Sequence, residues 1–248
     1  MVGDEAATSA VVVVDTSTPS TVVTAGVDGV EIARFEHDGF HHLECIGDLV
    51  ARSEQALIDR GVRLGAIGVV VGPGGFSGLR IGVSFASVFA FARQLPVVAL
   101  SALELTARSV EPAIRNRFVV LDGQRSEVFY ALYRADGDVV CELGRGHCPM
   151  EEILQHVDPS WLEEASPEWI LFGSGVVRYR DRVPTAPWLV VGDPEDGLLR
   201  SRPWIAETFR LWGAGMVVDP EEVEVLYLRD ADARANVASV LLESRERS

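Results

Sequence analysis

The fold is decided by residues 72–82, which read GPGGFSGLRIG. An apolar run at 66–71 (AIGVVV) predicts a strand that leads into this stretch, and the pattern of 79–93 predicts a helix that leads out of it. The glycines permit a tight strand-to-helix turn and a close approach of the backbone to other groups. We expect Ser77 to cap the helix, with the N–H groups of its first turn facing an anion or a carbonyl. No Lys-Ser/Thr pair follows the glycines, so the stretch is not a P-loop.

Outward from this loop, one order of elements occurs twice. Before the loop, β-branched runs and the turn Asp28-Gly29 predict a meander of strands at 10–15, 21–27 and 30–35, then a helix at 42–60. A strand at 96–100 and a helix at 102–110 follow the loop. The second half is expected to contain strands at 117–122, 126–134, 138–143 and 169–172, helices near 149–157 and 203–213, and a loop over 181–203. The order β-β-β-α-β-α, met twice, predicts an α/β protein of two similar domains joined near 108–116.

Composition narrows the classes of function. The 248 residues carry a formal net charge of -15, and a surface this acidic repels a phosphate backbone, which excludes unaided nucleic-acid binding. The three cysteines, Cys45, Cys141 and Cys148, are too few and too irregular for a disulfide framework. Residues 1–10 lack the pattern of a signal peptide, and no apolar run reaches the ~18 residues of a membrane helix. We therefore expect a cytoplasmic protein without a membrane partner.

The whole loop is similar to the GPGSFTGLRIG signature of the TsaB/YeaZ family. Its signature residues are Gly72, Pro73, Gly74, Gly75, Phe76, Ser77, Gly78 and Arg80. Four other segments resemble that family in the same order: 14–18 (VDTST), 121–130 (LDGQRSEVFY), 172–175 (FGSG) and 225–229 (VLYLR). The resemblance implies the actin-like/sugar-kinase (ASKHA) superfold with two RNase H-like domains, over 1–110 and 111–248. It leaves open that the last helix returns to the first domain.

The family resemblance implies a non-catalytic subunit. Such a subunit binds and activates TsaD, its catalytic paralogue, in the complex that forms N6-threonylcarbamoyladenosine at position 37 of tRNAs. TsaE, an ATPase, is a further partner in that complex, and tRNA is reached only through the complex. The resemblance implies no cofactor of the chain's own and leaves open an ATP molecule at the interface of the complex. An ATP-dependent phosphotransferase and a metallopeptidase of the same superfold remain as alternative functions.

A metal site is not expected. The catalytic paralogue follows its next strand with a His-x-x-x-His motif, whose spacing places two imidazoles on one helical face. Ser101 and Leu105 fall at those places here, and Leu105 cannot bind a metal. His41 and His42 precede the helix at 42–60, where solvated or capping histidines are the commoner case.

The remains of a nucleotide cleft are visible through the superfold. The residues at places corresponding to its phosphate and adenine turns are Asp15, Thr16, Ser17, Asp122, Gly123, Gly173 and Gly175. Asp15 and Asp122 could orient a metal-bound nucleotide. An aspartate that ends a strand is equally an ordinary turn residue, and that alternative stays open.

The helix at 79–93 is the expected partner surface. Gly82, Ala86 and Ala90 form a stripe of small residues, flanked by Phe85 and Phe89. A buried core helix explains this pattern equally well. The family implies that this helix and the helix containing Leu49 pack against the equivalent pair of TsaD, and against a second copy when the chain is alone. On that hypothesis, Ala86→Arg would spare folding and abolish pairing, and Arg80 would need a charge partner or lie in solvent.

Overall fold

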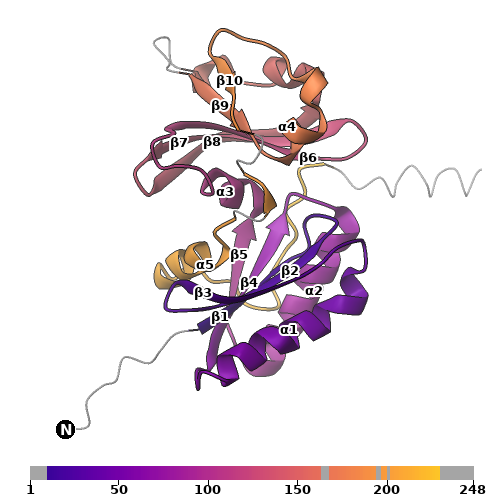
Figure 1. Ribbon diagram of the computed structural model, residues 1–248, viewed down its shortest axis with the longest axis vertical. Helices are drawn as coiled ribbons and strands as arrows, with labels where there is room; N and C mark the ends of the chain where they lie inside the picture. Colours follow the sequence, from indigo (N-terminus) through magenta and orange to yellow (C-terminus); the bar gives the residue numbers. More distant parts are fainter. Residues whose placement is uncertain (1–9, 163–167, 194–196, 200–201, 230–248) are drawn as a thin grey trace, which may run out of the picture.

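The computed structural model describes residues 10–162, 168–193, 197–199 and 202–229. The described strands form two five-stranded mixed sheets, one in each half of the chain (Figure 1). The first sheet has the order β3-β2-β1-β4-β5. Its strands are β1 (Ala10–Asp15), β2 (Thr21–Val27), β3 (Val30–His37), β4 (Leu64–Gly72) and β5 (Val97–Ser101).

The second sheet repeats this topology in the order β10-β9-β6-β7-β8. In each half, the first strand pairs antiparallel with the second and parallel with the fourth. Its strands are β6 (Asn116–Asp122), β7 (Glu127–Asp136), β8 (Val139–Pro149), β9 (Trp169–Phe172) and β10 (Leu189–Val191). The repeated topology confirms the prediction of two RNase H-like sheets.

Helices cover both faces of the first sheet. α1 (His42–Ile58) and α2 (Phe76–Arg93) pack on one face, and α5 (Trp204–Gly213) packs on the other. Along β1, Val12 and Val14 join the cluster of α1 and α2, whereas Val11 and Val13 join that of α5. A strand buried on both faces has no polar alternation, and this explains the unbroken apolar run of β1.

α5 lies very close to the sheet because glycines occupy the strand positions that it packs on. A Cβ on Gly65 would come within 2.5 Å of the Trp212 ring, and one on Gly68 within 2.8 Å of Thr208 Oγ1. A side chain at either position would push the helix away from the strands. A helix from the end of the described chain therefore covers the sheet built by its beginning.

The second half departs from expectation in its connections. The helix expected near 149–157 is a 3₁₀ helix, η1 (Met150–Gln155), because Pro149 and Pro159 bound a segment too short for a stable α-helix. The predicted loop at 181–203 contains β10, which is only three residues long and is ordered by pairing with β9. Three short elements had no clear sequence signal: η2 (Pro159–Trp161), α4 (Ser174–Arg178) and η3 (Arg180–Arg182).

α3 (Ala102–Ala107) lies between the two sheets (Figure 1). Leu103 of α3 belongs to one apolar cluster that also contains Val98 of the first sheet and Val119 and Ala131 of the second. Burial of these side chains joins the two halves through a common core. Within the described part of the chain, no helix combines the length and apolar character that crossing a bilayer requires.

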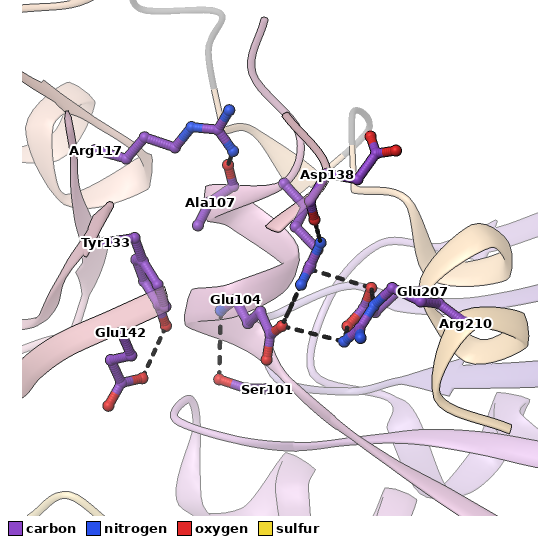
Figure 2. A network of polar contacts seen from close by, with 10 residues as sticks. Ser101, Glu104, Ala107, Arg117, Tyr133, Asp138, Glu142, Glu207 and Arg210 are labelled. Atoms are coloured by element: carbon purple, nitrogen blue, oxygen red, sulfur yellow. Dashed lines mark hydrogen bonds and ion pairs between the residues drawn. The ribbon is translucent and has the colours of Figure 1, made fainter. Parts of the chain in front are cut away.

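A polar network reinforces this junction (Figure 2). Arg108, which follows α3, contacts Glu104 at 2.9 Å and Glu207 at 3.2 Å, and donates to the carbonyl of Asp138 at 3.0 Å. Arg210 of α5 completes the group through Glu207 at 2.6 Å. Arg117 Nη1 donates to the carbonyl of Ala107 at 2.8 Å. The network therefore ties α3, α5 and the β7–β8 turn together.

Candidate functional site

The GPGGFSGLRIG loop leaves β4 at Gly72, which has a φ of +129° that favours glycine. The next peptide bond, Gly72-Pro73, is cis. α2 then begins with Gly75 as its N-cap, and no side chain caps it. The prediction that Ser77 is the cap is wrong. The helix starts earlier because the N–H of Gly75 is held by the carbonyl of Ser17 at 2.9 Å.

Three glycines of this stretch lie against the turn that follows β1. A Cβ on Gly74 would overlap the carbonyl of Ser17, one on Gly78 the carbonyl of Thr16, and one on Gly82 the hydroxyl of Thr16. The same hydroxyl donates to the carbonyl of Gly78 at 2.8 Å. Gly78 and Gly82 are one helical turn apart, so both face this turn. The glycines thus serve a tight contact within the chain.

The carboxylate of Asp15 is fully engaged. Its Oδ1 accepts from the N–H and the hydroxyl of Ser17 at 2.9 and 2.6 Å, and its Oδ2 accepts from Arg202 Nη1 at 2.8 Å and Trp204 Nε1 at 3.0 Å. A carboxylate offers about four lone-pair sites. Asp15 is 1% exposed, so a metal or nucleotide could reach it only by breaking a buried ion pair.

In the second half of the predicted cleft, one carboxylate oxygen of the half-buried Asp122 is engaged. Asp122 Oδ1 accepts from the N–H of Gln124 at 2.8 Å and from the hydroxyl of Tyr179 at 2.9 Å. Gly173, with a φ of +112°, lies against the carbonyl of Val120. Gly175 packs on the side chain of Val120, where a Cβ would come within 2.7 Å. These two glycines allow the start of α4 to approach β6.

A cavity of about 520 Å³ opens between the loop and the β6–β7 turn. Of the predicted cleft residues, Ser17, Asp122 and Gly123 line this cavity. Asp15, Thr16, Gly173 and Gly175 are outside its lining and have the packing roles given above. The structure therefore brings only part of the predicted set to one open space.

The segment 226–229 crosses the cavity between the two halves. The N–H of Leu226 donates to the carbonyl of Val71 at 2.8 Å, which attaches the segment to β4. Arg229 Nη1 contacts the carbonyl of Gly123 at 3.1 Å and Glu127 Oε2 at 2.8 Å, which attaches it to the second sheet. The VLYLR stretch of the sequence thus acts as a bridge.

Two buried polar residues of the lining, Arg202 and His42, were not predicted for this cavity. Arg202 lies in the stretch interpreted as a loop, and no sequence pattern pairs it with a residue 187 positions away. His42 is 4% exposed, with Nδ1 2.7 Å from Thr21 Oγ1, whereas the adjacent His41 is exposed. Burial lowers the pKa of His42, although Asp15 and Glu44 oppose that shift. A helix-start position alone does not reveal such burial.

The surface of α1 and α2 corrects the predicted interface. Leu49, Gly82, Ala86 and Ala90 are buried within the chain's own fold, so the stripe of small residues faces inward, not toward a partner. The sheet needs a close-packed helix on this face, and small side chains supply it. Because Ala86 is 0% exposed, its burial argues against the expectation that Ala86→Arg spares folding.

An apolar groove lies beside that buried stripe. Phe85 and Phe89 stack in it with ring centroids 5.8 Å apart, and Leu43 and Val88 are 72% and 70% exposed. The groove encloses about 850 Å³. Its lining consists of Leu43, Ile46, Arg80, Ile81, Ser84, Phe85, Val88, Phe89, Ala92 and Arg93. We call this set the α1/α2 groove.

Arg80 stands at the edge of the α1/α2 groove. Its Nε donates to the hydroxyl of Tyr227 at 2.9 Å, and its guanidinium lies 4.0 Å from the ring centroid of Phe76. Among the described residues Arg80 has no carboxylate partner. Aromatic rings thus hold a cation at the start of α2, where the helix dipole disfavours it.

The residues in place of the metal motif have structural roles. Ser101 accepts the N–H of Glu104 at 3.3 Å and caps α3, and Leu105 is 0% exposed in the core. Over the described residues, no group of three or more His, Cys, Asp or Glu side chains could hold an ion.

A family model described as "TsaD: tRNA N6-adenosine threonylcarbamoyltransferase" matches residues 39–165. The chain is 25% identical over 242 residues to the tRNA threonylcarbamoyladenosine biosynthesis protein TsaB of Escherichia coli (strain K12), covering 95% of this chain and 99% of that protein. It is 38% identical over 103 residues to the tRNA N6-adenosine threonylcarbamoyltransferase of Geobacter sp. (strain M21), covering 39% of this chain and 28% of that one. The structure of YeaZ from Pseudomonas aeruginosa shares the fold, with a TM-score of 0.70 at 24% identity over 89% of this chain and 100% of that chain.

Proposed function

This chain belongs to the TsaB/YeaZ family, and we propose that it is a non-catalytic subunit that binds and activates a TsaD-type transferase in the formation of N6-threonylcarbamoyladenosine at position 37 of tRNAs. The observation that carries the proposal is the α1/α2 groove. Leu43 and Val88, which line it, are 72% and 70% exposed. Contiguous exposed apolar side chains of this kind mark a protein-binding surface.

The chemistry of the groove fits a helical partner. Stacked Phe85 and Phe89 provide an apolar floor between Arg80 and Arg93, which stand 13 positions apart on one helix. Arg93 is engaged by Glu54 at 3.1 Å, whereas Arg80 lacks a carboxylate partner among the described residues. A TsaD-type partner would bury the apolar floor and offer an acidic group to Arg80. In its absence, a second copy of the chain would use the same face.

The non-catalytic part of the proposal rests on Asp15. All four of its acceptor positions are taken by Ser17, Arg202 and Trp204, at distances between 2.6 and 3.0 Å. This arrangement disfavours the alternative phosphotransferase, which would need a carboxylate available to a metal-bound nucleotide. Ser101 and Leu105 disfavour the metallopeptidase, because neither supplies an imidazole.

The negative net charge of the chain determines how it would contact RNA in this proposal. With a net charge of -15, the chain would reach tRNA in the cytoplasm through the complex, in which a TsaE-type ATPase is a further partner. The subunit brings no cofactor of its own, and an ATP at the interface of the complex is compatible with this assignment.

Co-purification with the TsaD-type protein of the same cell tests the proposal, together with an assay of tRNA modification. Val88→Glu places a charge in the groove at a position 70% exposed, so it should fold and lose both pairing and activation. Val139→Glu is the matched control, because Val139 is 69% exposed at the start of β8, outside the groove. Normal pairing by Val88→Glu, or full activity of the transferase without this chain, would overturn the proposal.

A further inference from the structure

The α1/α2 groove exposes apolar side chains that the described part of the chain leaves uncovered. Leu43 and Val88 are 72% and 70% exposed, and the groove encloses about 850 Å³. Arg80 and Arg93 belong to its lining, near the two ends of α2. Contact of apolar surface with water is unfavourable, so such a surface favours an occupant. The occupant that fits has an apolar face with a carboxylate toward each end.

The chain passes the Arg80 end of this groove just before the last described residue. The hydroxyl of Tyr227 accepts from Arg80 Nε at 2.9 Å, and the ring of Tyr227 lies 5.3 Å from that of Phe76. Asp230 follows Tyr227 by three positions, and three extended residues span at most about 11 Å. The 230–248 segment, which lies outside the described residues, therefore starts within reach of the groove.

The sequence of the 230–248 segment has the pattern of an amphipathic helix. Its apolar positions at spacings of four, three and one are Ala233, Val237, Val240 and Leu241. This spacing places the four side chains on one helical face. The segment contains no glycine or proline and is rich in alanine, leucine, glutamate and arginine, which favour helices. It thus offers the apolar face that the groove lacks.

The length and charge of the segment also match the groove. Arg80 and Arg93 stand 13 positions apart, a helical distance of about 20 Å. Asp232 and Glu246 stand 14 positions apart. A helix that runs parallel to α2 would bring Asp232 to Arg80, which has no carboxylate partner among the described residues. It would bring Glu246 to Arg93, which is paired with Glu54 and still 44% exposed.

We propose that the 230–248 segment docks as an amphipathic helix in the α1/α2 groove of its own chain and covers it until a partner displaces it. Attachment beside Arg80 gives the segment an effective concentration on the order of millimolar, so a weak contact suffices. The docking itself follows from the length, charge and apolar pattern of the segment. Its consequence rests on the proposed function, because a TsaD-type partner would compete for the same groove. The docked segment lowers the apparent affinity for that partner.

Cysteine trapping in the full chain tests the docking directly. In the parallel register Val240 lies beside Val88, so the Val88→Cys/Val240→Cys chain should form an intramolecular disulfide on mild oxidation. Val139→Cys/Val240→Cys is the matched control, because Val139 is 69% exposed and outside the groove. Its trapping should be at least about tenfold slower. Peptide mass mapping identifies the joined positions, and Val240→Cys alone reports any reaction with the three native cysteines.

Two substitutions in the segment connect docking with pairing. Leu241→Asp places a charge on the docking face and should abolish trapping, whereas Ser239→Asp, on the opposite face of the helix, should not. In titrations with the TsaD-type protein, Leu241→Asp should raise the apparent affinity about tenfold if the segment occupies the groove nine-tenths of the time.

The outcomes separate this inference from the proposed function. The inference is overturned if position 88 joins position 88 of a second copy instead of position 240. It is also overturned if trapping is no faster than in the Val139→Cys control, or if Leu241→Asp leaves it unchanged. Rapid trapping in a chain that fails to pair with the TsaD-type protein would overturn the proposed function and leave the docking intact.

Discussion

Arg202 Nη1 and Asp15 Oδ2 lie 2.8 Å apart in an ion pair whose side chains are 3% and 1% exposed. The pair joins the end of β1 to a residue two positions before α5, 187 positions along the chain. A buried charge is tolerated when its partner and hydrogen bonds compensate its lost hydration. Asp15 is compensated in this way, so the pair is part of what positions α5.

Removing one partner of this pair should be far more costly than removing both charges. Arg202→Met leaves the Asp15 carboxylate buried and unpaired, and should lower the free energy of unfolding by about 3–5 kcal/mol. The double variant Asp15→Asn/Arg202→Met should recover part of that loss. Urea denaturation measures both, and a loss below about 1 kcal/mol for the single variant would contradict the assigned burial.

The contact between Gly82 and Thr16 predicts that a smaller residue at position 16 compensates for a larger one at position 82. Gly82→Ala would overlap the Thr16 hydroxyl and should destabilise the chain by about 1–3 kcal/mol. Adding Thr16→Ala removes the overlapping oxygen and should restore part of the stability. Gly47→Ala is the control, because no atom of the described residues lies within 4 Å of its Cβ and it should stabilise α1 by up to about 1 kcal/mol. Strictly additive effects at positions 16 and 82 would refute the contact.

Neighbouring positions of α2 should respond oppositely to arginine. Ala86 is 0% exposed, on the buried side of α2, so Ala86→Arg should abolish cooperative unfolding. Ser84 is exposed on the groove side, and Ser84→Arg should change stability by no more than about 1 kcal/mol. Circular dichroism melting distinguishes them, and a stably folded Ala86→Arg chain would mean that this face of α2 is not core.

The buried imidazole of His42 predicts a loss of stability in mild acid. The unfolded chain protonates this residue near pH 6.5, whereas burial lowers its pKa in the fold. Below that pH the unfolded chain binds more protons than the folded chain. The free energy of unfolding therefore decreases as the pH is lowered, by at most about 1.4 kcal/mol per pH unit, until the folded pKa is reached. His42→Gln should remove this part of the pH dependence in a phosphate-free buffer, and His41→Gln should keep it. Identical pH slopes for His42→Gln and the parent would exclude the effect.

Local patterns were enough to predict both meanders and the helix after the loop. The β-branched runs became strands, and Asp28 and Gly29 became a turn with positive φ at both residues. The roles of Gly82 and Ala86 could not be predicted, because a stripe of small residues suits a partner helix and the chain's own sheet equally well. The pairing of Arg202 with Asp15 depends on the tertiary path and has no local signal. The boundary near residue 110 stays a prediction.

The path of the backbone after β10 limits how the protein can be divided. α5 covers the first sheet although it lies near the end of the chain, and the segment 226–229 is attached to both sheets. If the chain were divided between residues 110 and 111, the first fragment would contain the first sheet without α5. That helix would belong to the second fragment. Neither half is therefore a self-contained module, and a reassembled pair would have to rebuild its shared parts across the break.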